Sequence, residues 1–163
     1  MKSAPIYKGI ITGVAMIGLT LFFFYSKIAS DSGYQYLVYL LYAAGIIWTL
    51  LAYARSPHYT GKFANIFGQG FRCFIIITLL MTIFAAVFSL SHPEFAEQDA
   101  KSYREYLEKE EKSKTPAEKD EMVENLKKHY TTGLIYSAIF GHLILGALIT
   151  AVGAGIILAI RKT

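Results

Sequence analysis

Four long runs without a charged residue constrain the fold of this chain more than any other feature of its sequence. The runs cover residues 9–26, 32–54, 73–91 and 130–160. A helix needs about 20 mainly apolar residues to cross the hydrocarbon core of a bilayer. Barrel strands also satisfy backbone polar groups in lipid, but they alternate apolar with polar residues and these runs do not. We therefore predict four membrane-spanning helices, at about 6–26, 35–54, 73–92 and 133–160.

Two other interpretations of the runs fit their sequences less well. Buried helices of a soluble bundle would each carry a polar face, and none of the four runs shows one. The first run follows Lys2 and Lys8, as the apolar part of a signal peptide would, but no clear small-x-small cleavage site follows it. We expect the first run to be a retained helix.

The charged residues are divided by sign among the connections. Seven basic residues and no acidic residue lie in the N-terminal flank, in 55–72 and at the C-terminus, whereas 11 of the 12 acidic residues lie in 93–129. Short segments rich in Lys and Arg stay in the cytoplasm. We predict that both termini are cytoplasmic and that 93–130 is periplasmic in a cell with two membranes. The net charge of +4 is then a sum over two compartments, so we expect contact with membrane lipids and no nucleic-acid partner.

The acidic segment carries the pattern of two helices. Apolar or aromatic residues form two seams at spacings of three and four, through Ala96, Ala100, Tyr103 and Leu107 and then through Val123, Leu126 and Tyr130. Between the seams, 115–118 reads Thr-Pro-Ala-Glu, a capping box with proline at the first helical position. We predict helices at about 94–112 and 116–130, packed as an antiparallel hairpin outside the membrane.

These patterns define the predicted fold class. It is all-α, with a single integral membrane domain over 1–163 that consists of a four-transmembrane-helix bundle and the extramembrane hairpin at about 94–130. Tyr103 and Tyr106 form a candidate partner surface on the hairpin, because tyrosine is enriched at protein interfaces. The alternative is that the hairpin's charges are only a solvated face.

His142 is a candidate functional residue because it lies inside a predicted span. Ionisable residues within the membrane are commonly functional. The alternative is a neutral, structural histidine whose ring is satisfied by one backbone carbonyl or by a hydroxyl of another span. No Asp, Glu, Lys or Arg lies in a span core, which argues against a proton-coupled exporter of the small four-span type.

Small residues recur four apart in the first and last spans, and the helical neighbours of His142, Gly146 and Gly153 among them, form a further stripe of small residues. Both patterns are typical of closely packed membrane helices. The candidate packing residues are Gly9, Gly13, Gly146, Ala147, Ala151, Gly153 and Gly155.

We find no catalytic or metal-binding motif and expect no cofactor. Cys73 is the single cysteine, so the chain can form no internal disulfide. His92 and His129, with Glu94 nearby, are predicted at the outer ends of two spans, but their spacing matches no metal motif.

Aromatic residues recur at helical spacing in 63–72, between Lys62 and Arg72. This pattern predicts a short helix lying in the inner membrane interface, with Gly68 and Gly70 easing a turn into the third span.

Three short motifs, together with the glycine-rich last span, resemble a known family. They are Tyr7-Lys8-Gly9-Ile10-Ile11-Thr12-Gly13, Phe67-Gly68-Gln69-Gly70-Phe71-Arg72 and Pro93-Glu94-Phe95. The chain resembles the domain of unknown function 4199 family, small four-span inner-membrane proteins found mainly in Bacteroidota. The resemblance covers nearly the whole chain and implies a Gram-negative inner membrane. It carries over no functional residue, because the family has no established activity.

Two hypotheses for function follow from these observations. The first is a non-enzymatic accessory or scaffold subunit of an inner-membrane assembly, which contacts another membrane protein or a second copy through small-residue helix faces and the hairpin. The second is an oligomeric small transporter or lipid-handling protein with His142 at the pathway. An enzyme acting on a lipid-linked substrate is a third possibility, but no nucleophile–base pair can be named for it.

Overall fold

The computed structural model describes residues 4–26, 33, 35–111 and 113–161. Its helices are α1 (Ala4–Tyr25), α2 (Gln35–Ala54), α3 (Phe63–Ser91), α4 (Glu94–Glu110) and α5 (Pro116–Arg161). The described residues contain no strand, and α1, α2, α3 and α5 are long and apolar enough to cross a membrane. The predicted all-α class and the prediction of four helices able to span a membrane are confirmed. Residue 112, the predicted end of the first hairpin helix, lies outside the described residues.

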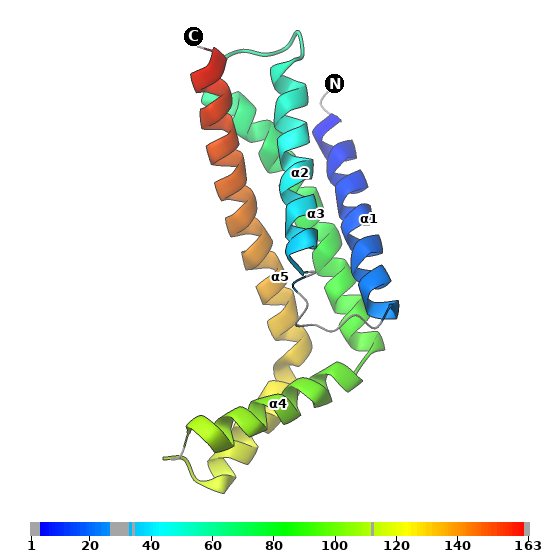
Figure 1. The fold of residues 1–163 in the computed structure, drawn as a ribbon, viewed down its shortest axis with the longest axis vertical. Helices are drawn as coiled ribbons and strands as arrows, with labels where there is room; N and C mark the ends of the chain where they lie inside the picture. Colours follow the sequence, from blue (N-terminus) through cyan, green and yellow to red (C-terminus); the bar gives the residue numbers. More distant parts are fainter. Residues whose placement is uncertain (1–3, 27–32, 34, 112, 162–163) are drawn as a thin grey trace. The chain divides into compact units, whose positions relative to one another are not determined.

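The chain forms two compact units, which we describe separately. The bundle unit comprises Met1–Thr82 and Ala138–Thr163, and the second unit comprises Ile83–Ser137. In the bundle unit, α1, α2 and parts of α3 and α5 run alongside one another (Figure 1). Met16, Tyr42, Ile46 and Ile77 are completely buried there, and Phe74 is nearly so. The bundle unit therefore has a close-packed core between its helices.

The α3 helix differs from its prediction at its N-terminal end. It begins at Phe63 and continues to Ser91, so the prediction of a separate short helix in 63–72 is wrong. The rings of Phe63, Phe67 and Phe71 stack on successive turns, with centroids 5.9 and 6.4 Å apart. Gly70 makes no turn, because it lies against Thr150 of α5 and Leu50 of α2, where a Cβ atom would clash.

In the second unit, α4 packs against the N-terminal part of α5. Ala100 and Leu107, two residues of the first predicted seam, are each only 1% exposed. The Tyr130 hydroxyl donates to the Asp99 carboxylate at 3.0 Å, and the Arg104 guanidinium lies 2.9 Å from the carboxylate of Asp120. Later residues of α4 thus meet earlier residues of α5, as in an antiparallel pair. The position of this helix pair outside a membrane remains a prediction.

A capping box fixes the start of α5. The backbone N–H of Thr115 donates to Glu118 Oε2 at 2.7 Å, and the N–H of Glu118 lies 3.4 Å from the Thr115 hydroxyl oxygen. Pro116 occupies the first helical position, where its missing N–H leaves no intrahelical bond unmade. These contacts are those expected from the sequence at 115–118.

Candidate functional site

The bundle unit contains a cavity of about 490 Å³ among α1, α2, α3 and the connection between α2 and α3. Its walls are formed by Ala4, Pro5, Lys8, Thr49, Ala52, Tyr53, Ser56, His58, Gln69 and Arg72. This volume is within the range of small-molecule binding sites, about 300–1,000 Å³. We call it the basic cavity, because its charged wall residues are one lysine and one arginine.

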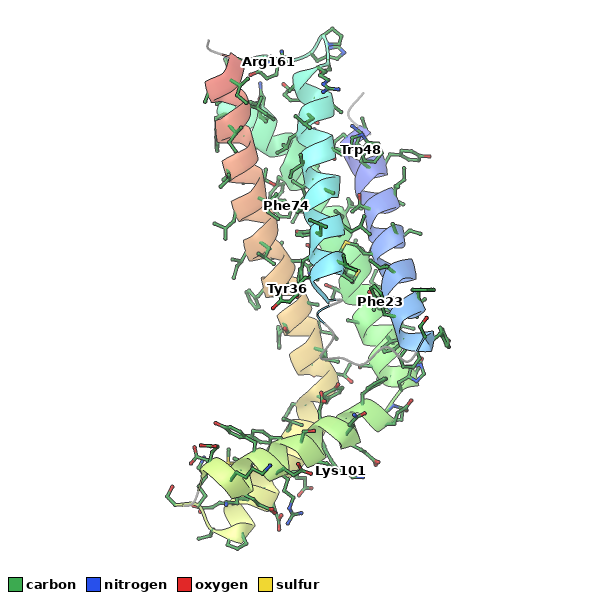
Figure 2. The ribbon with its side chains drawn as sticks, in the orientation of Figure 1. Phe23, Tyr36, Trp48, Phe74, Lys101 and Arg161 are labelled. Atoms are coloured by element: carbon green, nitrogen blue, oxygen red, sulfur yellow. The ribbon has the colours of Figure 1, made fainter. Side chains whose placement is uncertain are left out.

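Among the described residues, the wall of the basic cavity has two cationic side chains and no carboxylate. Lys8 is half-buried, and its Nζ lies 5.0 Å from the centre of the Trp48 ring. Arg72 is exposed, and within the described part of the chain neither cation forms an ion pair. Figure 2 labels Trp48 and Arg161 toward the same end of the bundle unit. Positive charge therefore gathers where α1 begins and α5 ends.

The hydroxyl groups of the cavity wall donate to backbone carbonyls. Tyr53 donates to the carbonyl of His58 at 3.1 Å, and Ser56 donates to the carbonyl of Tyr53 at 2.8 Å. The Thr49 hydroxyl donates to the backbone carbonyl of Gly45 at 3.0 Å. The side chains of Lys8, His58, Gln69 and Arg72 form no hydrogen bond among the described residues. These four side chains remain as the groups that can donate to a ligand.

A close contact between α1 and α3 holds the two cations near each other. Gly9 lies so near α3 that an added Cβ would be 2.7 Å from the backbone oxygen of Cys73 and 3.1 Å from Ile76 Cβ. Lys8 and Arg72 directly precede Gly9 and Cys73 in the sequence. The absent side chain of Gly9 therefore allows the approach that places both cations in one cavity wall.

His142 makes one side-chain hydrogen bond within the bundle unit. Its Nδ1 lies 2.7 Å from the carbonyl oxygen of Ala138, so Nδ1 carries a proton and donates it. The Tyr42 hydroxyl donates to the backbone carbonyl of His142 at 2.7 Å, and the two rings meet edge to face at 5.3 Å. This is the backbone-carbonyl arrangement that the structural alternative describes. Thr20 and Thr82 are not its partners among the described residues.

The candidate packing residues do not share one role. Gly9, Gly13, Gly146 and Gly153 each lie where an added Cβ would clash with a neighbouring helix, whereas nothing lies within 4 Å of that position at Gly155. Ala147 and Ala151 are half-buried. Gly45 and Gly70 lie at equally close contacts, with Thr12 and Thr150, and the sequence pattern did not single them out.

Tyr103 and Tyr106 lie together on α4. Their rings are nearly parallel, with centroids 6.4 Å apart and an interplanar angle of 15°. Tyr106 is 54% exposed, while Ala100 and Leu107 of the same helix are buried. Tyr106 therefore lies on a face of α4 that the second unit leaves accessible, and Tyr103 is half-buried beside the packed seam of Ala100 and Leu107.

His92 contacts the carboxylate of Glu94 at 2.7 Å and the rings of Phe88 and Phe95. The backbone N–H of Glu94 itself and then the His92 side chain hold the pKa of Glu94 below its usual range. The described residues contain no group of three or more His, Cys, Asp or Glu side chains that could hold a metal ion. His129 is exposed and does not join this cluster among them.

The basic cavity was not predicted from the sequence. The sequence patterns use Lys8 and Arg72 in separate segments of the chain, and three-dimensional contacts are needed to bring residues 64 positions apart into one wall. The available signal was that each cation directly precedes a small residue of an apolar span, where two helices can approach closely.

Comparison with known proteins identifies the family of the chain. No curated protein and no solved structure matches the chain. A family model with the description "protein of unknown function (DUF4199)" matches residues 7–158, which includes all four apolar helices and α4. The chain therefore belongs to the DUF4199 family.

Proposed function

We propose that this protein is a non-enzymatic accessory or scaffold subunit of an assembly in a bacterial inner membrane. Both termini are cytoplasmic in this proposal, and 93–130 is periplasmic, because the basic and acidic connections alternate along the chain. A second membrane protein or a second copy of the chain is the partner. Small-residue helix faces and the α4 surface provide the contacts.

The observation that carries the proposal is Tyr106, which is 54% exposed on α4 and stacks against the half-buried ring of Tyr103. Tyrosine is enriched at interfaces and among the residues that contribute most to binding, because its ring is large, rigid and amphipathic. A face of α4 that only needed solvation would gain nothing from an exposed aromatic ring supported by a second one. Ala100 and Leu107 are buried on the same seam as Tyr103, and this packing fixes the orientation of the pair.

The test is purification of the tagged protein from its native membrane in mild detergent, followed by mass spectrometry. Wild type is compared with the double variant Tyr103→Ser/Tyr106→Ser and with Lys101→Ser, an exposed control on α4. We expect one stoichiometric protein partner, or a defined homo-oligomer, with wild type and with the control, and its loss with the double variant. Isolated monomers from wild-type membranes would contradict the proposal.

A second candidate function is an oligomeric small transporter or lipid-handling protein, with His142 at the pathway. The Nδ1 of His142 donates to Ala138, but no hydrogen-bond partner for its Nε2 is found among the described residues. Nε2 is thus an acceptor in the neutral ring, available to a transported group. Four helices form a narrow bundle, so a pathway requires an oligomer.

Replacement of His142 tests this second function. In proteoliposomes, His142→Ala should abolish the movement of a fluorescent phospholipid between leaflets while the protein stays folded by size-exclusion chromatography. Ile144→Ala is the matched control, because Ile144 is 59% exposed on the same helix. Wild-type rates with His142→Ala would remove the only embedded histidine from this role.

A further inference from the structure

We propose that the basic cavity binds a phosphate-bearing anion, and that this anion is the headgroup of an anionic phospholipid. The inference goes beyond the accessory role and does not depend on it, because the cavity lies in the bundle unit and the tyrosine pair lies in the second unit.

The charges of the cavity wall select the sign of the ligand. Lys8 and Arg72 face one space whose wall holds no carboxylate, and neither is neutralised by an ion pair among the described residues. Cations that line a cavity with low-dielectric walls concentrate the field in that cavity and attract anions. Arginine adds a planar pair of N–H donors that matches two phosphate oxygens, and lysine adds a point charge.

The hydrogen-bonding groups of the wall favour a ligand rich in acceptors. The hydroxyl protons of Tyr53 and Ser56 are directed to backbone carbonyls. The donors that remain are the Lys8 ammonium, the Arg72 guanidinium, the Gln69 amide and the His58 ring. A phosphate group presents several acceptor oxygens for these donors, whereas a cationic ligand, or a ligand with donors only, can accept from neither of the two charged groups.

The position of the cavity favours a lipid as the source of the phosphate. Its walls come from the end of three apolar helices, where the headgroups of a bilayer would lie. Ile10 and Ile11, which follow Lys8 by two and three residues on α1, are 43% and 41% exposed. Acyl chains can lie along the exposed apolar surface of α1 while the phosphate occupies the cavity. Basic pockets between membrane helices bind anionic headgroups in this way.

Trp48 provides a local probe of binding. It is the single tryptophan of the chain, and its ring lies 5.0 Å from the ammonium of Lys8. A phosphate that draws the ammonium away should change the fluorescence of Trp48. The protein is placed in nanodiscs of phosphatidylcholine with increasing phosphatidylglycerol, and native mass spectrometry counts the lipids retained.

Two double variants distinguish the effect of the cations that line the cavity from the effect of cations elsewhere on the protein. The double variant Lys8→Gln/Arg72→Gln removes both cavity cations, and Arg55→Gln/Lys62→Gln removes two exposed cations that do not line the cavity. We expect the cavity variant to bind phosphatidylglycerol at least about tenfold more weakly than wild type, since a hydrogen bond to a charged group contributes about 1.5–3 kcal/mol. The control should stay within about twofold, the scale of exposed charges. Lys8→Arg/Arg72→Lys should keep binding and shows that the fold tolerates changes at both sites.

Each other outcome overturns part or all of the inference. Equal binding of phosphatidylglycerol by wild type, cavity variant and control overturns it entirely, provided that the variants elute as folded protein. If inorganic phosphate binds with the same dependence on Lys8 and Arg72 while phosphatidylglycerol content has no effect, the phosphate site stands and the lipid source is wrong.

Discussion

Gly9 is the residue on which the geometry of the basic cavity depends most directly. A Cβ atom at this position would lie 2.7 Å from the backbone oxygen of Cys73, and a backbone atom cannot move aside as a flexible side chain can. We expect Gly9→Ala to reduce the free energy of unfolding in detergent by about 1–3 kcal/mol, the usual cost of overpacking. It should also weaken lipid binding, because α1 must move away from α3.

Gly18→Ala is the matched control for this prediction. Gly18 lies on the same helix, and nothing is within 4 Å of the position that its Cβ would occupy. Alanine is the better helix former, so this change should be neutral or stabilising by up to about 1 kcal/mol. Thermal unfolding of both variants measures the difference. Equal stability of the two variants would show that α1 and α3 are not in this contact.

At the residue scale, the sequence predicts small residues at helix contacts better than it predicts which contacts they make. The spacing of four pointed to Gly9, Gly13 and Gly146, all of which lie against another helix. It pointed equally to Gly155, whose surroundings are open. The spacing did not identify Gly45. Its close contact is with Thr12 on another helix, and the spacing of residues within one helix contains no information about that neighbour.

At the element scale, the start of α5 depends on the reciprocal contacts of Thr115 and Glu118. The N–H of Thr115 and then its hydroxyl stabilise the carboxylate and lower the pKa of Glu118. A lowered pKa in the folded state means that this stabilisation is complete above the unfolded value, about 4.3, and is lost as the pH falls through the folded value. Protection factors of amides in the first turn of α5 should therefore fall in acid.

Hydrogen exchange, corrected for intrinsic rates, measures this prediction. Glu118→Ala, which removes the acceptor for the Thr115 N–H, should lower the protection of the first turn at neutral pH and remove most of its further loss in acid. Glu121→Ala changes an exposed carboxylate on the same helix and should behave as wild type. An unchanged first turn in Glu118→Ala at neutral pH would contradict the role of the capping box.

Elements were predictable where their signals are local. The capping box at 115–118 and the apolar runs are encoded in adjacent residues, so the start of α5 and the four long helices follow from them. The start of α3 was misread because Gly68 and Gly70 resemble turn residues. Only the contact of Gly70 with Thr150, 80 positions away in the sequence, explains why a glycine occupies a continuous helix.

At the scale of the whole molecule, acidic residues are concentrated in one segment of the chain. The described cations of the bundle unit lie with the basic cavity at one end of the apolar helices, whereas 11 of the 12 acidic residues lie in 93–129. This division supports the proposed orientation, with the cavity facing the cytoplasm. It also gives the two proposals separate locations, lipid binding in the bundle unit and partner binding on α4.

Photo-cross-linking from α4 in the native membrane tests the accessory role most directly. A photoreactive amino acid replaces Tyr106 in one variant and Lys101 in another, two exposed positions about 140° apart around the helix. The account predicts one discrete cross-linked protein from position 106 and none from position 101. No cross-linked protein from position 106, or the same products from both positions, would contradict it.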